Sequence, residues 1–224
     1  GTVRPLDGTN DAVAVSDMGA FEYSGGIPHS TLDPDDGMWR SGPVTVTITS
    51  SDDSTGSPPT VYYRQNGGAT TTYTVPFSVT ATGTTTIDYW GVDDVGNVEP
   101  TNTASIRIDE APPVTTDTAP SGWQTMPVDV SLSATDDLSG VALTEWWTMG
   151  SPVPQPYMGP VTISAEGITT LYYRSTDVAG NVEATKTVDV LIDYTAPDAN
   201  DDCPAGWQQS SFFVECSATD ALSG

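Results

Sequence analysis

Positive charge is scarce in this sequence, which carries 6 Lys and Arg against 30 Asp and Glu, for a formal net charge of −24. Nucleic acids and anionic membranes are polyanions, and proteins bind them through clusters of Lys and Arg. The charge balance therefore argues against both as partners. Such an acidic surface instead suits solubility, high salt, or a divalent cation held between clustered carboxylates.

Histidine and cysteine are also scarce: His29 is the single histidine, and Cys203 and Cys216 are the only cysteines. Neither a Ser–His–Asp set nor a Cys–His set can be assembled from them, and no glycine-rich phosphate loop precedes a helical pattern. We therefore expect no enzymatic activity in this chain. Nor does any apolar run approach the roughly 18 residues of a membrane-spanning helix, so we expect no membrane insertion.

What the sequence does contain is a repeat, marked by Trp39, Trp123 and Trp207 at positions i, i+84 and i+168. Shortly after each tryptophan, apolar and polar residues begin to alternate, as on a strand with one buried face. The alternating sets are Val44, Val46 and Ile48, then Val128, Val130 and Leu132, then Phe212, Val214 and Cys216. Self-similarity at a fixed spacing indicates an internal repeat in which each copy is one structural unit.

Each copy is rich in Thr, Ser, Val, Gly and Pro, a composition that favours short strands joined by turns. In the second copy, strands are predicted near Val114–Thr118, Val128–Ala134, Ala142–Trp147, Gln155–Met158, Val161–Ser164, Ile168–Thr176 and Ala184–Asp193. Seven such strands are typical of an immunoglobulin-like sandwich. We therefore predict an all-β fold of tandem antiparallel immunoglobulin-like β-sandwiches, with stiff proline-containing junctions at Pro112–Pro113 and Ala196–Pro197.

Several stretches resemble bacterial immunoglobulin-like repeats, which are fibronectin type III-like and occur in tandem in large extracellular and cell-surface proteins. The stretches read VSLSATDDLSGV, LYYRSTDVAGNVEATKTVDVLIDYTAP, VTITSSDD and IDYWGVDDVGNVEP. The first copy departs from the pattern at its Pro58–Pro59 turn and at its closing IDEAPP. The resemblance implies a secreted or cell-surface location.

Residues 1–26 lie outside the repeat. Within them, Asp17, Gly19, Ala20, Glu22 and Tyr23 resemble the segment that closes a right-handed parallel β-helix in large secreted bacterial proteins. We therefore expect residues 1–26 to be the closing segment of an upstream β-helix or a linker. Residues 27–111 and 112–195 are then the two sandwich repeats, and residues 196–224 are the first strands of a truncated third repeat.

Acidic loops are the best candidates for a binding site, because the loops after the second and sixth strands of such a sandwich lie at one pole. Clustered carboxylate, amide and carbonyl oxygens are the ligands that Ca²⁺ takes. Turn chemistry explains the same residues equally well, since Asp caps its own backbone and Gly or Asn accepts a positive φ. The candidate ligands are Asp52, Asp53, Asp93, Asp94 and Asn97 in the first copy and Asp136, Asp137, Asp177 and Asn181 in the second, joined by Asp109 from the junction.

The two cysteines both fall in the third copy and flank its Trp207 turn. Cys216 holds the inward position that Ile48 and Leu132 hold in the earlier copies, and Cys203 lies on the entry strand beside it. We expect a disulfide between them, because no histidine or further cysteine is near enough for a metal or catalytic role. Closing this loop would stabilise the fold by about 3 kcal/mol, and a disulfide agrees with an oxidising, extracellular setting.

Aromatic side chains offer a second kind of site. Trp146 and Trp147 are adjacent on a predicted strand, so one faces the core and the other faces outward. Exposed aromatic faces stack on sugar rings, and the candidates for glycan stacking are Tyr63, Trp90 and Trp147. Packing within the sandwich is the alternative for these residues.

Two functions of different classes follow. The first is a structural module without catalytic activity, as a stalk, an adhesin shaft or a subunit of an extracellular filament. Such a module would be rigidified by Ca²⁺ at its junctions and would pair with neighbouring repeats or like chains by strand addition. The second is a carbohydrate-binding accessory module that tethers an upstream polysaccharide-active domain to extracellular polysaccharide.

Overall fold

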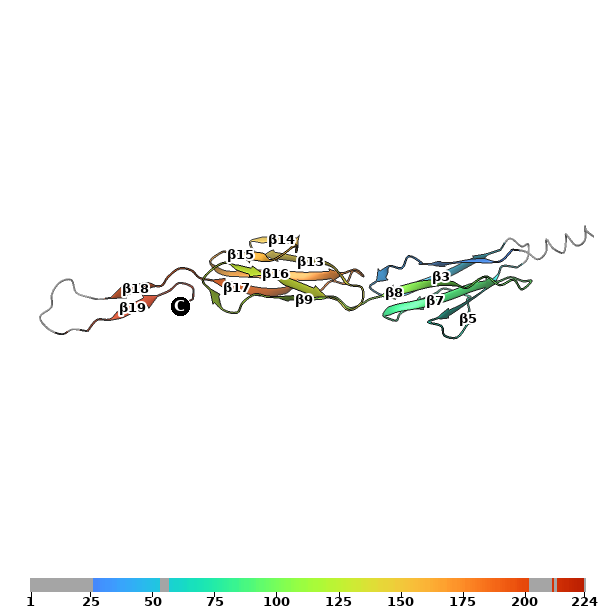
Figure 1. Cartoon of the computed structure of the whole chain (residues 1–224), viewed down its shortest axis with the longest axis horizontal. Helices are drawn as coiled ribbons and strands as arrows, with labels where there is room; N and C mark the ends of the chain where they lie inside the picture. Colours follow the sequence, from blue (N-terminus) through green and yellow to red (C-terminus); the bar gives the residue numbers. More distant parts are fainter. Residues whose placement is uncertain (1–25, 53–56, 202–210, 212, 224) are drawn as a thin grey trace, which may run out of the picture. The chain divides into compact units, whose positions relative to one another are not determined.

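A computed structural model describes residues 26–52, 57–201, 211 and 213–223 of the chain. The described residues contain strands and turns and no helix, and nearly all strands pair antiparallel (Figure 1). The prediction of an all-β sandwich is therefore confirmed. The chain divides into two compact units between Ala111 and Pro112. The β-helix motif predicted near the N-terminus lies outside the described residues.

The described residues of the first unit form eight strands in two sheets. Its strands are β1 (His29–Asp33), β2 (Trp39–Arg40), β3 (Val44–Ser51), β4 (Thr60–Gln65), β5 (Thr71–Thr72), β6 (Phe77–Val79), β7 (Gly83–Val92) and β8 (Asn102–Ile108). One sheet has the order β1-β3-β6 and the other the order β2-β8-β7-β4-β5. Among these described strands, β2 alone is parallel to its neighbour, with Trp39 opposite Arg107 on β8.

Alternating sequence explains how these two sheets close on each other. Along β7 the even spacing of Thr85, Ile87 and Tyr89 places three buried side chains on one face, with half-buried residues between them. Side chains alternate in this way because successive residues of a strand point to opposite faces. The core between the sheets consists of Leu32, Val44, Val46, Ile48, Val61, Val79, Ile87, Tyr89, Ala104, Ile106 and Ile108.

The second unit repeats this arrangement. Its sandwich strands are β9 (Val114–Asp117), β10 (Trp123–Gln124), β11 (Val128–Val130), β12 (Leu132–Thr135), β13 (Val141–Thr148), β14 (Ser151–Pro156), β15 (Val161–Ile163), β16 (Gly167–Asp177) and β17 (Lys186–Ile192). The large sheet has the order β10-β17-β16-β13-β14, and β9 pairs with β12 while β11 pairs with β15. The core consists of Val130, Leu132, Val161, Ile163, Leu171, Tyr173, Val190 and Ile192.

One predicted strand is interrupted in this unit. The sequence predicted a continuous strand over Val128–Ala134, whereas β11 ends at Val130 and β12 begins at Leu132. Ser131 separates them because it exchanges hydrogen bonds with Thr118: its N–H donates to the Thr118 hydroxyl at 2.9 Å, and its carbonyl accepts from the Thr118 N–H at 3.0 Å.

A separate two-stranded hairpin follows the second sandwich. It pairs β18 (Asp198–Asp201) with β19 (Cys216–Thr219), antiparallel. All four residues of β19 are exposed. Cys216 is therefore exposed, and the inward position predicted for it is wrong, because no second sheet covers this hairpin in the part of the chain that the structure describes.

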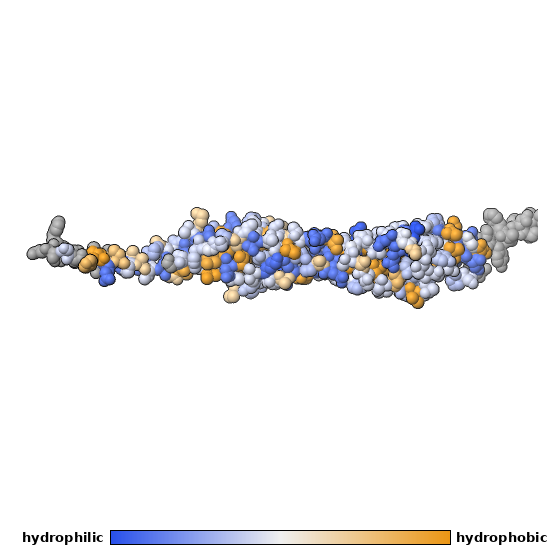
Figure 2. All heavy atoms as spheres, turned by 90° about the horizontal axis from the view of Figure 1, so that it is seen from below, coloured by the Kyte–Doolittle hydropathy of each residue, from blue (hydrophilic) through white to orange (hydrophobic). Residues whose placement is uncertain are grey.

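Hydrophobic and hydrophilic residues are interspersed on the face of the molecule seen in Figure 2. Exposed apolar side chains include Val75, Met126 and Met158. Within the described residues, no helix is long and apolar enough to cross a membrane.

Candidate functional site

Asp93 and Asp177 each organise the tight turn that follows the longest strand of their unit. Asp93 Oδ1 accepts hydrogen bonds from the N–H groups of Val95, Gly96 and Asn97 at 2.7–3.1 Å, and its Oδ2 accepts from the Asn97 side chain at 2.8 Å. Burial opposes the charge of Asp93, but these hydrogen bonds outweigh it and hold the pKa of its carboxyl below the ordinary value. This geometry agrees with the turn interpretation of the acidic loops.

The second unit repeats this turn with the same atoms. Asp177 Oδ1 accepts from the N–H groups of Gly180 and Asn181 at 2.7 Å, and its Oδ2 accepts from the Asn181 side chain at 2.7 Å. Gly96 and Gly180 both have a φ of +98°, which a residue with a side chain rarely adopts.

The loop after β12 lies against this turn, as the sequence predicted for the pole of a sandwich. Val178 N–H donates to the Gly140 carbonyl at 2.9 Å, and Asp136 Oδ2 accepts from Gly140 N–H at 2.7 Å. A carboxylate oxygen of Asp136 lies within 4.8 Å of one of Asp177. Asp137 is exposed. Calcium binding by these residues stays a prediction.

The matching loop of the first unit is described only in part. Asp94 is exposed, and its Oδ2 accepts from Ser57 N–H at 3.2 Å, which ties the loop to the turn after β7. Asp52 is half-buried. Asp53 lies outside the described residues.

Asp109 directly follows β8 and belongs to the first unit. Its side chain is fully buried, its N–H donates to the Arg40 carbonyl at 2.9 Å, and its Oδ1 accepts from Ala111 N–H at 3.1 Å. Asp193 takes the same part after β17: its N–H donates to the Gln124 carbonyl at 2.8 Å, and its Oδ1 accepts from Thr195 N–H at 3.0 Å. Both sandwiches therefore end in the same aspartate turn.

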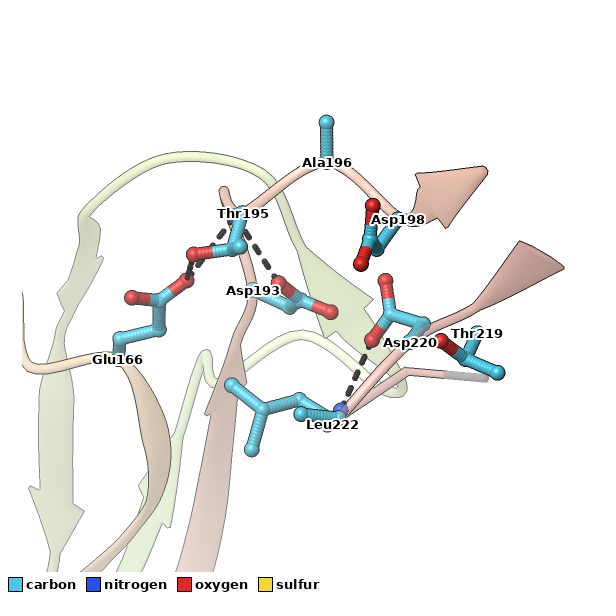
Figure 3. A pocket seen from close by; sticks show the side chains of 9 residues that line it. Glu166, Asp193, Thr195, Ala196, Asp198, Thr219, Asp220 and Leu222 are labelled. Atoms are coloured by element: carbon cyan, nitrogen blue, oxygen red, sulfur yellow. Dashed lines mark hydrogen bonds between the residues drawn. The ribbon is translucent and has the colours of Figure 1, made fainter. Parts of the chain in front are cut away.

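An acidic pocket lies where the second sandwich continues into the hairpin, within the second unit. It has a volume of about 610 Å³ and is lined by Glu166, Asp193, Thr195, Ala196, Asp198, Thr219, Asp220, Ala221 and Leu222. Figure 3 shows the carboxylates of Asp193, Asp198 and Asp220 facing the same space. We refer to it as the junction pocket.

Two carboxylates of the junction pocket hold the linker between β17 and β18. Glu166 Oε1 accepts from the Thr195 N–H at 3.0 Å and from the Thr195 hydroxyl at 2.6 Å (Figure 3). It also accepts from the Tyr194 N–H at 3.1 Å. Asp193 Oδ2 accepts from Ser223 N–H, beyond β19, at 3.0 Å. Hydrogen bonding from Ser223 outweighs burial and holds the pKa of Asp193 below its ordinary value.

Sequence reasoning did not select the acidic residues of this pocket as a site. The sequence did contain an indication of it. Asp193 is the repeat equivalent of Asp109, and Asp220 is the repeat equivalent of Asp136, and both earlier residues were candidate ligands. Glu166 carried no such signal, since its role depends on the path of the linker.

Sequence reasoning also missed two buried glutamates, which are equivalent positions of the two repeats. Glu99 is 6% exposed and accepts from the N–H groups of Ser30 on β1 and Gly91 on β7 at 2.8 and 2.9 Å. Glu183 is 7% exposed and accepts from Thr115 N–H on β9 at 2.8 Å and, more weakly, from Ser175 N–H on β16 at 3.3 Å. Each glutamate thereby joins the two sheets of its sandwich.

The prediction that Tyr63 faces outward is wrong. Tyr63 packs against the core of the first unit and stacks on Phe77, with ring centroids 4.2 Å apart. Tyr62 faces outward instead and stacks on Trp90, with ring centroids 6.0 Å apart. Arg64 lies 5.8 Å from the centroid of the Trp90 ring.

Trp147 lies on the outer face of the second unit, as predicted, while Trp146 packs against the core. Trp147 stacks on Tyr172 with ring centroids 5.8 Å apart, and Arg174 lies 5.6 Å from the centroid of the Trp147 ring. Arg174 also forms an ion pair with Glu145 at 3.3 Å.

Both outer faces therefore carry a stacked aromatic pair beside an ion pair, and we call each set an aromatic cluster. In the first unit the aromatic pair is Tyr62–Trp90 and the ion pair is Arg64–Asp88, at 2.9 Å. The order of the two pairs along the strand differs between the units. On β4 the aromatic pair comes before the inward-facing pair Tyr63–Tyr89 and the ion pair comes after it. On β13 the ion pair comes before the inward-facing pair Trp146–Tyr173 and the aromatic pair comes after it.

The predicted disulfide stays a prediction. Cys216 begins β19 opposite Asp201, but Cys203 lies outside the described residues.

The chain was compared with protein families, curated proteins and solved structures. No family model and no curated protein matches the sequence. A solved structure of fibronectin(III)-like modules of CbhA from Clostridium thermocellum matches with a TM-score of 0.41 and 14% identity, over 73% of this chain and 94% of that chain. A likeness this low carries no functional argument, so the sandwich fold stands on the strand pairing of this chain.

Proposed function

We propose that this chain is a non-catalytic structural segment of a secreted or cell-surface protein, serving as a stalk, an adhesin shaft or part of a filament. The observation that carries the proposal is the hydrogen-bonded linker after the second sandwich. A structural segment transmits position and force along the chain, so its connections have to be ordered as well as its domains.

The linker is held from both of its sides. Glu166 accepts three hydrogen bonds from Tyr194 and Thr195, and Asp193 bonds both to Thr195 within the linker and to Ser223 beyond the hairpin. Each of these bonds has a charged acceptor, which makes it stronger than a hydrogen bond between two neutral groups. The proline that follows, Pro197, further limits the backbone.

Hydrogen exchange tests this part of the proposal. The amides of Thr195 and Ser223 are expected to exchange slowly in the native chain. Thr195 is expected to exchange faster when Glu166→Ala and Asp193→Ala remove its two acceptors. Ser223 is expected to exchange faster when Asp193→Ala is combined with Asp220→Ala, because Asp220 Oδ1 also accepts from Ser223 N–H, at 3.1 Å. Asp129→Asn is a suitable control, because Asp129 is exposed on β11 and accepts from the Thr162 hydroxyl on β15, outside the linker. Fast exchange of both amides in the native chain would overturn the proposal.

We further propose that Ca²⁺ binds in the junction pocket and stiffens the junction. Support comes from four carboxylate side chains among its nine lining residues, none of which carries a positive charge. Calcium takes several hard oxygen ligands in a tolerant geometry, and carbonyl groups of the linker would supply further oxygens.

Thermal unfolding with calcium chloride and with EGTA tests the metal. Calcium is expected to raise the unfolding midpoint of the second unit, and the combined Asp193→Asn and Asp220→Asn variant is expected to lose most of that rise. Asp129→Asn again serves as the control. An equal unfolding midpoint in calcium and in EGTA would contradict calcium binding in the junction pocket, but it would not contradict the proposal that hydrogen bonds order the linker.

A carbohydrate-binding accessory role is the second candidate, favoured by the aromatic clusters. Each unit displays a half-buried tryptophan on an outer sheet face, and flat aromatic surfaces stack on sugar rings. Intramolecular stacking by Tyr62 and Tyr172 occupies part of these ring surfaces, which weighs against the role. An accessory module of this kind would hold an upstream polysaccharide-active domain on its substrate.

Binding to insoluble and soluble polysaccharides separates the two candidates. If the chain is an accessory module, Trp90→Ala and Trp147→Ala each weaken binding, and both together abolish it. Met158→Ala removes an exposed apolar side chain elsewhere and is the matched control. We expect no tryptophan-dependent binding, and finding it would replace the purely structural function.

A further inference from the structure

Strand β14 forms one edge of the large sheet in the second unit, and its sequence is Ser-Pro-Val-Pro-Gln-Pro. Five of its six residues are exposed. Proline has no backbone N–H group. Pro152, Pro154 and Pro156 therefore present carbonyl oxygens along this edge but no hydrogen-bond donor.

The other donors of β14 mostly face its own sheet. Tyr157 N–H, just after the strand, donates to the Thr144 carbonyl on β13 at 2.8 Å. Because donors alternate between the two sides of a strand, the N–H of Gln155 also points toward β13, where Gln155 is opposite Trp146. Pro156 is the residue between them, so its nitrogen points away from the sheet.

The first residue of β14 is also committed to β13, since Ser151 is opposite Thr148 where the two strands meet at their turn. Val153 is 64% exposed and has no partner residue in the pairing of β14 with β13. Its N–H is therefore the one backbone donor of β14 that could be offered to another strand. A strand that adds to a sheet edge needs a donor at every second residue. With at most one donor, β14 cannot supply this ladder.

Five other edge strands of the described sandwiches are limited in different ways. Strands β2, β5 and β10 are each two residues long, which is too short to template another strand. On the edge strands β1 and β9, the N–H groups of Ser30 and Thr115 are accepted by the carboxylates of Glu99 and Glu183.

We propose that β14 is a barrier to strand addition, both between copies of this chain and between successive repeats. Domains of similar sequence joined in one chain meet at high local concentration, and mispairing between them is a characteristic failure of repeat proteins. The longest edge strand of the large sheets is the one that carries the prolines. This inference goes beyond the proposed function and limits one prediction made from the sequence: if like chains pair by strand addition, they do so through a strand other than β14.

Restoring the donors tests the barrier. The triple variant Pro152→Thr, Pro154→Thr, Pro156→Thr places three N–H groups and three β-favouring residues on the edge. Sedimentation equilibrium is expected to show an average mass that rises with concentration for this variant and stays at the monomer mass for the native chain. Val153→Thr is the matched control, because it changes the same strand without adding a donor, and it is expected to remain monomeric.

Circular dichroism establishes that each variant is folded. If the triple variant does not fold, the single variant Pro156→Thr takes its place, because its new N–H points away from β13. Its average mass is then expected to rise with concentration as well. A folded variant that remains monomeric over the whole concentration range, or a native chain that associates through protected β14 amides, would overturn the proposal.

Discussion

At the scale of single residues, carboxylates stabilise this very acidic chain where they lie inside it. Glu183 accepts hydrogen bonds from Thr115 and Ser175 and pairs with the Lys186 ammonium group at 2.8 Å. Burial of Glu183 raises its pKa, but the hydrogen bonds from Lys186 and Thr115 outweigh this effect and bring the pKa below its ordinary value. A buried charge is tolerable when it is paired and hydrogen-bonded in this way.

Removing the acceptor should therefore cost stability. Glu183→Ala leaves the buried N–H of Thr115 without its partner, and we expect the free energy of unfolding of the second unit to fall by about 3 kcal/mol. Urea titration followed by NMR reads the amide signals of each unit separately, so the first unit with its intact Glu99 is the internal control. A loss below about 0.5 kcal/mol, the range of ordinary surface substitutions, would contradict the role given to Glu183.

The same residue predicts a dependence on pH. Because the pKa of Glu183 is lower in the folded state than its ordinary value of 4.5, its ionisation stabilises the fold above that pH, and this contribution is lost as the pH falls through the folded pKa. The difference in unfolding free energy between the native chain and Glu183→Gln is thus expected to be larger at pH 7 than at pH 3. A difference that is the same at both pH values would contradict this assignment.

At the scale of elements, the two turns after β7 and β16 show how much a short motif can predict. One of the two interpretations of the acidic loops was a turn in which Asp caps its own backbone and Gly or Asn has a positive φ, and the structure has this φ at Gly96 and Gly180. Loop lengths are less predictable. Tyr73 and Tyr157 are equivalent residues, separated by the same spacing as the repeat tryptophans. Their N–H groups donate to the carbonyl groups of Val61 and Thr144, and these two residues are one position closer together in the sequence than the repeat spacing.

This shift of one residue explains the error at Tyr63. The chain from Ile48 to the inward-facing Tyr63 is one residue longer than the chain from Leu132 to the inward-facing Trp146. A constant repeat spacing therefore assigns the residues of β4 to the wrong face. The sequence alone could not reveal this extra residue. The connection after β4 is shorter by one residue than the connection after β13, so the repeat spacing is the same again at Tyr73 and Tyr157. Pairing of Tyr63 with Tyr89, seen only in the folded sheet, settles which face is buried.

Alanine at Gly180 is expected to destabilise the second unit by about 1–2 kcal/mol, because a side chain is strained at a φ of +98°. Gly150→Ala is the matched control, since Gly150 has open space around it and no positive φ in this range. Thermal unfolding of the two variants measures the difference. Equal midpoints would mean that the turn after β16 adapts to a side chain without strain.

At the scale of the whole molecule, net charge opposes the compact state. The formal net charge of −24 is spread over 224 residues, and like charges repel one another more weakly when salt screens them. We expect the unfolding midpoints of both units to rise between low and moderate sodium chloride concentrations. Midpoints that fall over this range would show that attractive ion pairs, such as Arg64–Asp88, dominate over repulsion.

What the sequence could establish at this scale was the fold class and the repeat, because both follow from strand periodicity and fixed spacing. It could not find the junction pocket, since that pocket joins Glu166, Asp193 and Asp220 from three separate segments. The buried role of Glu99 and Glu183 was equally hidden, because a glutamate in a turn usually faces water.

A structural function requires, above all, an ordered linker after the second sandwich. Backbone ¹⁵N relaxation of Tyr194, Thr195 and Ala196 in the native chain tests this order most directly. Hydrogen bonding to Glu166 and Asp193 predicts order parameters of about 0.85, as in the strands of the sandwich. Order parameters below about 0.6 at these residues, with rigid strands on either side, would contradict the structural function proposed for this chain.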